Sequence, residues 1–464
     1  MWQPGEYEEV AGRAVEALGR YVERTQRGDG PALSRPPLPG VQRDLDLHRL
    51  IREGGIDLDA FLAGYLERSN RKHHPGALAH QVAVPDVPSA IADLVHGATN
   101  NPGSMYEMGA AAATVEVTVV EWMLEKVGFE PTPGAGILTH GGTLANLTAM
   151  LAARARAAPE AWTDGVGGDL AVLAPPSAHY SIARNTAMLG LGEGAIVPLE
   201  VDELERIRPD RLGGALERAG RAGRRPMMLV AASCATTTGL HDDLVAIGDF
   251  CREHGVWFHA DAAHGASALL SPRHRHLLDG IEQADSVIWD AHKMLRTSSL
   301  CAAVLMRDEA ALTGAFHQEA SYLFYGEDHP DAFDVMPRQV ECTKAQLGLK
   351  LFLSLAWRGE QGLGEYVADR YDATLRFWEL IRGREGFECP YRPESNILCF
   401  RYGTDSDAQI EIRERLMEEG RFHLSSAELS GERYLRMAVM APSSGEGTVL
   451  EMLDAIERVA VAAR

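Results

Sequence analysis

The sequence predicts an α/β protein: a large domain built on a mostly parallel sheet, followed by a small C-terminal α+β domain. Two observations support this fold class. From about residue 75 to residue 308, short apolar runs alternate with amphipathic stretches of helical periodicity. Such alternation is typical of parallel strands covered by helices on both faces. After residue 343 the order changes to one long helical pattern and then mixed strands and helices, which indicates a second, smaller domain.

Apolar runs are expected to form the strands of the large sheet at the following positions: Leu170–Ala174, Met227–Ala232, Val256–His259, Ser286–Trp289 and Ala302–Met306. Helices are expected between them over Thr143–Ala157 and Asp243–His254. In open sheets of this kind, ligands bind beyond the carboxyl ends of the strands. The loops that follow these runs are therefore where chemistry is expected.

The chain is divided into three parts. Residues 1–74 are predicted to form a helical N-terminal segment, with a helix over Val10–Thr25 and a Pro- and Gly-rich connector over Gly28–Gly40. The large domain is assigned to residues 75–342 and the small domain to residues 343–464. The expected elements of the small domain are a helix, two strand regions and a closing helix: Thr343–Trp357, Phe387–Tyr402, Tyr434–Met440 and Thr448–Ala462.

Composition excludes several classes of protein. The 464 residues include 45 Lys and Arg against 66 Asp and Glu, and the net charge of −21 disfavours nucleic-acid and anionic-membrane partners. No apolar stretch is long enough to span a bilayer, and the N-terminus lacks the pattern of a signal peptide. The six cysteines form no C-x-x-C pair, and no P-loop or H-E-x-x-H motif occurs. The sequence therefore predicts a cytoplasmic protein with no membrane or nucleic-acid partner and no metal site.

Two features suggest a binding site for a ligand, the first of them for an anionic one. A Gly-rich turn, Thr139-His140-Gly141-Gly142-Thr143, opens a long helical pattern, and free N–H groups at a helix start suit a phosphate. About half of such turns are only helix caps by our estimate. Asp261 ends a buried strand and is followed by small residues, so its carboxylate could face a ligand. The alternative for Asp261 is a cap on the next loop.

Two further features lie at the ends of other strands. Lys293 follows the apolar run Ser286–Trp289, and partial desolvation there would make its amine a nucleophile for carbonyl groups. The alternative is a surface lysine. His179 lies in the loop after Leu170–Ala174, where it is either a ligand-facing group or a core histidine. The four features together fit pyridoxal phosphate, which needs a phosphate cradle, a carboxylate at the pyridine nitrogen, a stacking group and a lysine.

The sequence resembles the group II pyridoxal-phosphate decarboxylases, which have the aspartate-aminotransferase-like fold (fold type I). Glutamate, cysteine-sulfinate and aromatic amino-acid decarboxylases are familiar members. The resemblance extends from about His74 to the C-terminus and is most specific between His179 and Met306. The motifs His74-Pro75, His80-Gln81, Met105-Tyr106-Glu107 and Gly136–Asn146 are more similar to the glutamate and cysteine-sulfinate branch than to the aromatic branch.

The resemblance implies roles for residues around the cofactor. Lys293 would form the Schiff base with the cofactor, His179 would stack on its ring, and Asp261 would pair with the pyridinium nitrogen. The remaining cofactor contacts would be made by Gly142 and Thr143 at the phosphate, His292 beside it, Thr236, and Ala263 near the ring.

The resemblance also implies a substrate site and a homodimer. Arg436 would hold the α-carboxylate of an amino-acid substrate. His80 and Gln81 would line the side-chain end of the pocket, where they could hydrogen-bond an acidic or amide group. An acidic substrate such as glutamate, aspartate or cysteine sulfinate is favoured, and an aromatic substrate stays open. Family members form homodimers with their active sites at the subunit boundary.

Two departures from the family pattern affect the predicted chemistry. Asp290-Ala291 stands where the family has Asn-Pro, and an Asp there adds negative charge near the phosphate. The family also uses a loop tyrosine to protonate the substrate Cα, and that position falls at His329 or Pro330 here. His329 could itself be the acid, Tyr325 could substitute, or the position could be an ordinary exposed loop residue.

Loss of the loop acid diverts related enzymes to other products. An oxygen-dependent aldehyde synthase (oxidative deaminase) or a transaminase is therefore an alternative to a simple decarboxylase. A catalytically silent homologue that serves as a binding or assembly subunit is a further alternative. The intact set of Lys293, His179 and Asp261 argues against the silent homologue.

Overall fold

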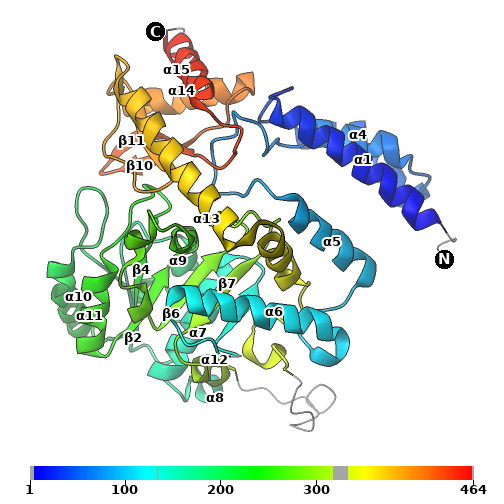
Figure 1. Ribbon diagram of the computed structural model, residues 1–464. Coiled ribbons are helices and arrows are strands. Elements are labelled where there is room, and N and C mark those ends of the chain that lie inside the picture. The colour runs from blue at the N-terminus through cyan, green and yellow to red at the C-terminus, as the bar shows by residue number, and fades with distance from the viewer. Residues whose placement is uncertain (1–4, 133, 317–332, 462–464) are drawn as a thin grey trace.

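The computed structural model describes residues 5–132, 134–316 and 333–461 (Figure 1). Its main feature is a seven-stranded sheet with the order β1-β7-β6-β5-β4-β2-β3. The strands are β1 (Gly136–Thr139), β2 (Leu170–Ala174), β3 (Ile196–Pro198), β4 (Arg225–Ala232), β5 (Trp257–Asp261), β6 (Ser286–Asp290) and β7 (Ala302–Met306). Strand β7 pairs antiparallel with β1 and β6, whereas the other neighbours pair parallel. The predicted mostly parallel sheet is therefore confirmed.

Helices cover both faces of this sheet. Adjacent strand residues point to opposite faces, so Val287 of β6 packs in one hydrophobic cluster and Ile288 in the other. One face is covered by α6 (Tyr106–Val127), α10 (Leu212–Arg221) and α11 (Leu244–His254). The other face is covered by α7 (Gly142–Ala157), α8 (Ala161–Asp164), α9 (Ser181–Met188) and α12 (Ala310–Ala315).

The apolar runs predict the central strands well and the edges of the sheet less well. Leu170–Ala174 and Ala302–Met306 have the predicted bounds, and the other three predicted strands differ by one or two residues at their ends. The sequence pattern does not predict β1 and β3. These strands have four and three residues, too few to show a periodicity, and each is held by its neighbour in the sheet.

The small domain is an antiparallel sheet with the order β10-β11-β9-β8. Its elements are β8 (Phe387–Glu388), β9 (Ile397–Tyr402), α14 (Ser406–Glu419), β10 (Ser425–Leu429), β11 (Glu432–Ala438) and α15 (Glu446–Val461). The predicted strand region Phe387–Tyr402 is interrupted, because Pro390 and Pro393 cannot donate ladder hydrogen bonds. Strand β10 is not predicted, since its five residues, Ser-Ser-Ala-Glu-Leu, include a single large apolar side chain.

Helix α13 (Leu347–Arg382) joins the two sheets (Figure 1). It starts four residues later and ends much later than the predicted helix Thr343–Trp357. A break at Gly359, where φ is +70°, divides it into two helical parts. The first part contacts α5 and α6, and the second part contacts α15 and the small sheet. The two parts of α13 together therefore connect the small domain to the large one.

The N-terminal segment is helical, as predicted. It contains α1 (Glu6–Gln26), α2 (Leu38–Asp44), α3 (Leu47–Glu53) and α4 (Leu58–Glu67), and α5 (Val87–Thr99) follows. Helices α1 and α4 pack on each other and project away from both sheets (Figure 1). The predicted connector Gly28–Gly40 is wrong at its end, because α2 begins at Leu38 with Pro39 in its first turn, where proline is tolerated. The domain boundaries after residues 74 and 342 stay predictions.

Candidate active site

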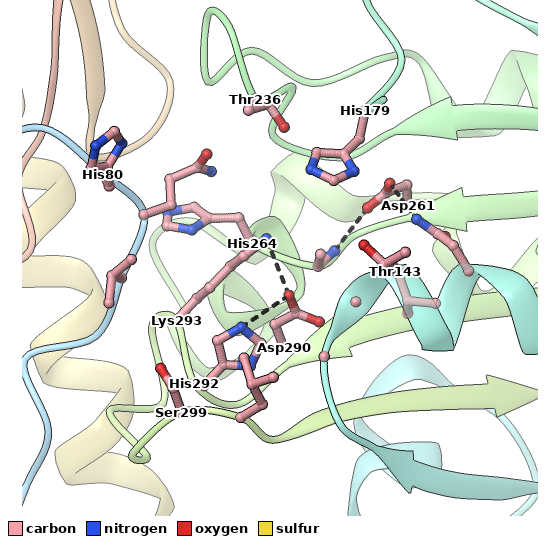
Figure 2. Close-up of a pocket in the computed structure, with 18 of the residues that line it drawn as sticks. His80, Thr143, His179, Thr236, Asp261, His264, Asp290, His292, Lys293 and Ser299 are labelled. Atoms are coloured by element: carbon pink, nitrogen blue, oxygen red, sulfur yellow. Dashed lines mark hydrogen bonds and ion pairs between the residues drawn. The ribbon is translucent and has the colours of Figure 1, made fainter. Parts of the chain in front are cut away.

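A cavity of about 530 Å³ opens at the carboxyl ends of the parallel strands (Figure 2). Loops after β1, β2, β4, β5 and β6 all contribute residues to its wall. The predicted site residues that line this cavity are His80, Gln81, Gly142, Thr143, His179, Thr236, Asp261, Ala263, His292 and Lys293. Arg436 lies behind the wall, and His329 lies outside the described residues. The structure thus brings together residues that are up to 213 positions apart (Lys293 − His80).

The turn between β1 and α7 leaves backbone N–H groups free at the cavity. Gly141 has φ of +103°, a conformation that L side chains rarely adopt, and α7 begins at the next residue. A Cβ atom on Gly142 would lie 2.9 Å from Oδ2 of Asp290, so this position excludes a side chain. The first turn of the 16-residue helix α7 therefore presents its N–H groups and positive dipole end to an anion.

Asp261 is the last residue of β5, and its carboxylate points into the cavity (Figure 2). Nδ2 of Asn146, on α7, donates a hydrogen bond to Oδ2 of Asp261 at 3.2 Å. The backbone N–H of Ala263 donates to Oδ1 at 3.4 Å. The carboxylate is held as an acceptor with its free face toward the cavity, as a partner for a protonated ring nitrogen must be.

His179 lies beside Asp261 on the cavity wall (Figure 2). Its Nδ1 is 2.7 Å from Oγ of Ser181, the first residue of α9. Burial lowers the pKa of His179, and attraction from Asp261 opposes that shift only in part. The imidazole is therefore neutral near pH 7 and can lie against an aromatic ring without adding charge.

Lys293 and Asp290 form an ion pair at the end of β6. Nζ of Lys293 is 3.2 Å from Oδ2 of Asp290, and Nε2 of His292 is 3.6 Å from the same oxygen (Figure 2). The Asp290 side chain is 3% exposed and faces the start of α7 at Gly142. An anion bound at this helix start would therefore meet the carboxylate of Asp290. The ion pair between Lys293 and Asp290 must also break before the Lys293 amine can react with an aldehyde.

Replacing Asp290 with asparagine is expected to tighten cofactor binding. The change keeps the shape of the side chain and removes one negative charge next to the predicted phosphate position. We expect the Kd for pyridoxal phosphate to fall by about tenfold, since screened repulsion of this kind amounts to at least about 1.4 kcal/mol. Absorbance titration of the cofactor-free protein measures this constant.

Asp169→Asn is the matched control, because Asp169 is a surface residue that pairs with Arg225 far from the cavity. It removes the same charge and is expected to leave the Kd unchanged. Weaker cofactor binding in Asp290→Asn than in this control contradicts the placement of Asp290 beside the phosphate.

Arg436 is buried behind the substrate side of the cavity. Nε donates to the carbonyl oxygens of Thr236 and Thr237, and Nη1 donates to the carbonyl oxygen of Ala79. Nη2 donates to Oε1 of Gln81 at 3.2 Å. In the part of the chain that the structure describes, no carboxylate forms an ion pair with Arg436, and burial lowers its pKa. A buried cation held only by neutral groups favours an anionic ligand nearby.

A second group of basic side chains lies at the His80 end of the cavity. The rings of His80 and His423 meet edge to face, with centroids 5.1 Å apart. Burial lowers the pKa of both, that of His423 to about 4, and repulsion from Lys72 and other cations adds to the shift. Both imidazoles are therefore neutral near pH 7 and can donate hydrogen bonds in a positive field.

Several cavity residues were not singled out by the sequence patterns. Asn146 lies one turn into α7, and His264 follows the strand-end run Asp261–Ala263. Proximity to the Gly-rich turn and to Asp261 was the only signal for them. Cys234 and Ser299 come from loops with no distinctive motif. The predicted loop acids Tyr325 and His329 lie outside the described residues.

Comparison with known proteins identifies the family. The model of the pyridoxal-dependent decarboxylase conserved domain matches residues 66–403. The chain belongs to this decarboxylase family. It is 30% identical over 446 residues to the acidic amino acid decarboxylase GADL1 of Bos taurus, covering 91% of this chain and 85% of that protein. It is 36% identical over 318 residues to the cysteine sulfinic acid decarboxylase of Mus musculus, covering 68% of this chain and 64% of that protein.

The structural comparison agrees with the family. A crystal structure of mouse CSAD matches with a TM-score of 0.90 at 27% sequence identity, and the match covers 98% of this chain and 99% of that chain. The predicted fold type I, the enzyme class of amino-acid decarboxylase and the cofactor pyridoxal phosphate are thereby confirmed. The individual roles of the site residues stay predictions.

The cavity of this family member fits pyridoxal phosphate. The start of α7 offers N–H groups where a side chain at Gly142 would clash. Among the described residues, Nδ1 of His264 is buried without a hydrogen-bond partner, so this atom can bond to a ligand or a water. Lys293 and Asp261 supply the amine and the carboxylate. These are the groups that the cofactor's aldehyde, phosphate and ring nitrogen require.

Buried neutral histidines in and around the site make folding sensitive to acid. Burial lowers the pKa of His241 to about 3, of His259 to about 4 and of His264 to about 3. In the unfolded chain each histidine binds a proton near pH 6.5, so between pH 6.5 and pH 4 the unfolded state binds more protons. Each of them then lowers the free energy of unfolding by about 1.4 kcal/mol per pH unit as the pH falls.

Asp242 opposes one of these contributions, because burial raises its pKa to about 6 and the native state takes up that proton. We therefore expect a net loss of stability as the pH is lowered from about 7 to about 5. Urea unfolding of the cofactor-free protein across this range measures it. A free energy of unfolding that stays constant or rises contradicts the neutral state of the buried histidines.

Proposed function

We propose that this protein uses pyridoxal phosphate to decarboxylate an acidic L-amino acid to its amine and CO₂. The positive potential at the His80 end of the cavity carries the choice of substrate class, because Lys72 and Arg436 both repel a proton from His80 there. Membership of the decarboxylase family supports the reaction class. The relatives named as acidic amino acid and cysteine sulfinic acid decarboxylases support an acidic substrate.

When bound, pyridoxal phosphate supplies the electron sink that accepts the electrons left at the substrate Cα. Lys293 would hold the cofactor covalently, and the N–H groups of Gly142 and Thr143 would bind its phosphate, with His292 beside it. Asp261 would keep the ring nitrogen protonated. His179 would pack on the ring as a neutral imidazole, with Ala263 and Thr236 completing the contacts. Preorganised charges of this kind stabilise the developing negative charge.

The substrate would lie between the cofactor and the basic end of the cavity. Arg436 would attract the α-carboxylate, acting beside Gln81, to which it donates a hydrogen bond. His80 and Gln81 would then hydrogen-bond the acidic side chain. Lys72 adds positive potential at this end, as its effect on His80 and His423 indicates. An acidic side chain would gain from this potential, and an aromatic side chain would not.

A substrate panel tests the proposal. CO₂ release is measured for cysteine sulfinate, aspartate, glutamate, tyrosine and tryptophan with the cofactor-loaded enzyme. We expect kcat/KM for the best acidic substrate to exceed both aromatic values by about a hundredfold or more, since a site built for polar groups rejects analogues that leave them unpaired. Preference for tyrosine or tryptophan would contradict the acidic substrate class.

The same panel distinguishes the alternative reactions. Equal amounts of amine and CO₂ are expected for a simple decarboxylase. Peroxide and ammonia together with an aldehyde would indicate the oxygen-dependent reaction, and loss of the cofactor's aldehyde form would indicate transamination. The identity of the Cα acid, whether His329 or Tyr325, stays a prediction.

We infer that the protein is a homodimer with active sites at the subunit boundary. The projecting pair of helices α1 and α4 exposes the apolar side chains Val15, Leu18 and Tyr65, which a second subunit could cover. Sedimentation of the purified enzyme tests this. A fully active monomer would contradict it.

We also propose a cytoplasmic location and no nucleic-acid partner. All six cysteines are free, as expected in a reducing compartment. The net charge of −21 disfavours binding to phosphate backbones. In the described residues, none of the helices combines the length and the apolar character that crossing a bilayer requires.

A further inference from the structure

A continuous series of hydrogen bonds runs beneath the cavity, with Asn146 at its centre. Asn146 is 1% exposed. Its Nδ2 donates to Oδ2 of Asp261 at 3.2 Å and to Oγ of Ser181 at 3.0 Å. Its Oδ1 accepts from Nε2 of His259 at 2.8 Å. The Asn146 amide therefore contacts both Asp261, the proposed partner of the ring nitrogen, and Ser181, which lies beside His179.

The orientation of the Asn146 amide follows from its neighbours. If the amide were rotated by 180°, its oxygen would face the Asp261 carboxylate, which is also an acceptor. Nε2 of His259 must then carry a proton, because Oδ1 of Asn146 can only accept. Burial lowers the pKa of His259 to about 4, so the ring is neutral and its Nδ1 accepts a hydrogen bond from Oγ of Ser286 at 2.8 Å.

The far end of the series is fixed by a group that can only donate. Nε1 of Trp257 donates to Oγ of Ser286 at 2.8 Å. That hydroxyl is therefore free to donate its own hydrogen to His259. The direction of every bond from Trp257 through Ser286, His259 and Asn146 to Asp261 is determined.

A branch of the same series reaches His179. Oγ of Ser181 accepts from Asn146, so its hydroxyl hydrogen is directed to Nδ1 of His179, 2.7 Å away. The backbone N–H of Ser181 points to the same Nδ1 at 3.3 Å. With two donors facing Nδ1, the single proton of the neutral imidazole is on Nε2.

We propose that Asn146 is a positioning residue that fixes the Asp261 carboxylate and the Nε2–H tautomer of His179 together. This inference rests on the proposed function, because it assigns Asp261 and His179 to the ring of pyridoxal phosphate. Asn146 keeps Asp261 aimed at the ring nitrogen. Through Ser181 it also keeps the imidazole uncharged, so that His179 does not oppose the positive charge of the ring.

Three variants test this assignment. Asn146→Leu removes the two bonds that Asn146 donates, and the one that it accepts from His259, at similar side-chain volume. Ser181→Ala removes the hydroxyl between Asn146 and His179 but keeps the backbone N–H that faces Nδ1. Thr148→Val is the matched control, because Thr148 is buried on the same helix and its hydroxyl donates to the carbonyl oxygen of Leu144, away from Asp261 and His179. The first readout is the ¹⁵N chemical shifts of His179 in the cofactor-free protein, assigned by loss of its signal in His179→Gln. The second readout is the Kd for pyridoxal phosphate.

In wild type and Thr148→Val, His179 is expected to show a single Nε2–H tautomer. In Asn146→Leu, where the Ser181 hydroxyl is free to accept a hydrogen bond, a population with the proton on Nδ1 should appear, whereas in Ser181→Ala the remaining backbone N–H should keep the proton on Nε2. The Kd should rise by about tenfold or more in Asn146→Leu, as expected for a lost hydrogen bond to a charged group, and stay near the wild-type value in Ser181→Ala.

The inference is overturned if His179 keeps its wild-type signals in Asn146→Leu. It is also overturned if Asn146→Leu changes the Kd no more than Thr148→Val does. Wild-type protein that binds no pyridoxal phosphate would instead contradict the proposed function. The tautomer readout needs no cofactor, so the two failures are distinguishable.

Discussion

Lys293→Ala is expected to abolish turnover and the visible absorbance of the cofactor-loaded enzyme. Lys293 follows the end of β6 and lines the cavity. Asp261 and the start of α7 line the same cavity. Without the Lys293 amine the cofactor has no covalent attachment and the product has no group to displace it. We expect kcat/KM to fall by roughly 10⁴-fold or more, by comparison with the removal of other covalent catalytic groups.

The matched control for this variant is Lys126→Ala. Lys126 lies on α6 and pairs with Glu360 on the surface, at 2.8 Å. It is expected to keep both the absorbance and the activity. Turnover by Lys293→Ala at a rate near that of the control would show that another residue holds the cofactor, and would remove the basis of the proposed mechanism.

Asp261→Asn is expected to give the second largest loss. The change keeps the hydrogen-bonding shape of the side chain but removes the negative charge that would keep the ring nitrogen protonated. The cofactor then becomes a poorer electron sink. We expect kcat to fall by about 10²- to 10³-fold, the range found when one preorganised group that stabilises transition-state charge is removed. Cofactor content should be measured in parallel, so that kcat is expressed per bound cofactor.

Asp242→Asn is the control for neutralising a buried aspartate near the same strands. The Asp242 carboxylate accepts hydrogen bonds from the backbone N–H groups of Ala232 and Ile207 and does not line the cavity. Its kcat per bound cofactor should be close to the wild-type value. An Asp261→Asn enzyme that turns over as fast as this control would show that Asp261 does not act on the ring.

The sequence predicts most of the fold because the central strands are buried on both faces. Leu170–Ala174 and Ala302–Met306 are uninterrupted apolar runs, and such runs need no tertiary information to be recognised. Strands β1 and β3 are too short for this signal and depend on pairing with β7 and β2. The start of α13 depends on packing against α6, where Gly348 lies against Glu116, whereas the break falls at Gly359, which has a left-handed φ of +70°.

The candidate site is predicted to a similar degree and for a related reason. Lys293, Asp261 and the Gly-rich turn each follow a recognisable strand or precede a recognisable helix, and strand ends meet at one edge of a parallel sheet. Asn146 is not predicted, because no sequence pattern marks a polar residue one turn into a helix as part of a site. Its function as a hydrogen-bond centre exists only once α7, α9 and β5 are packed together.

The measurement that tests the central claim most directly is the location of the bound cofactor. The chain has five lysines, Lys72, Lys126, Lys293, Lys344 and Lys350, so peptide mapping is unambiguous. Enzyme loaded with pyridoxal phosphate is reduced with borohydride, digested and analysed by mass spectrometry. We predict that the reduced cofactor is found on the peptide containing Lys293. Recovery of the cofactor on another lysine, or on none, would contradict the account.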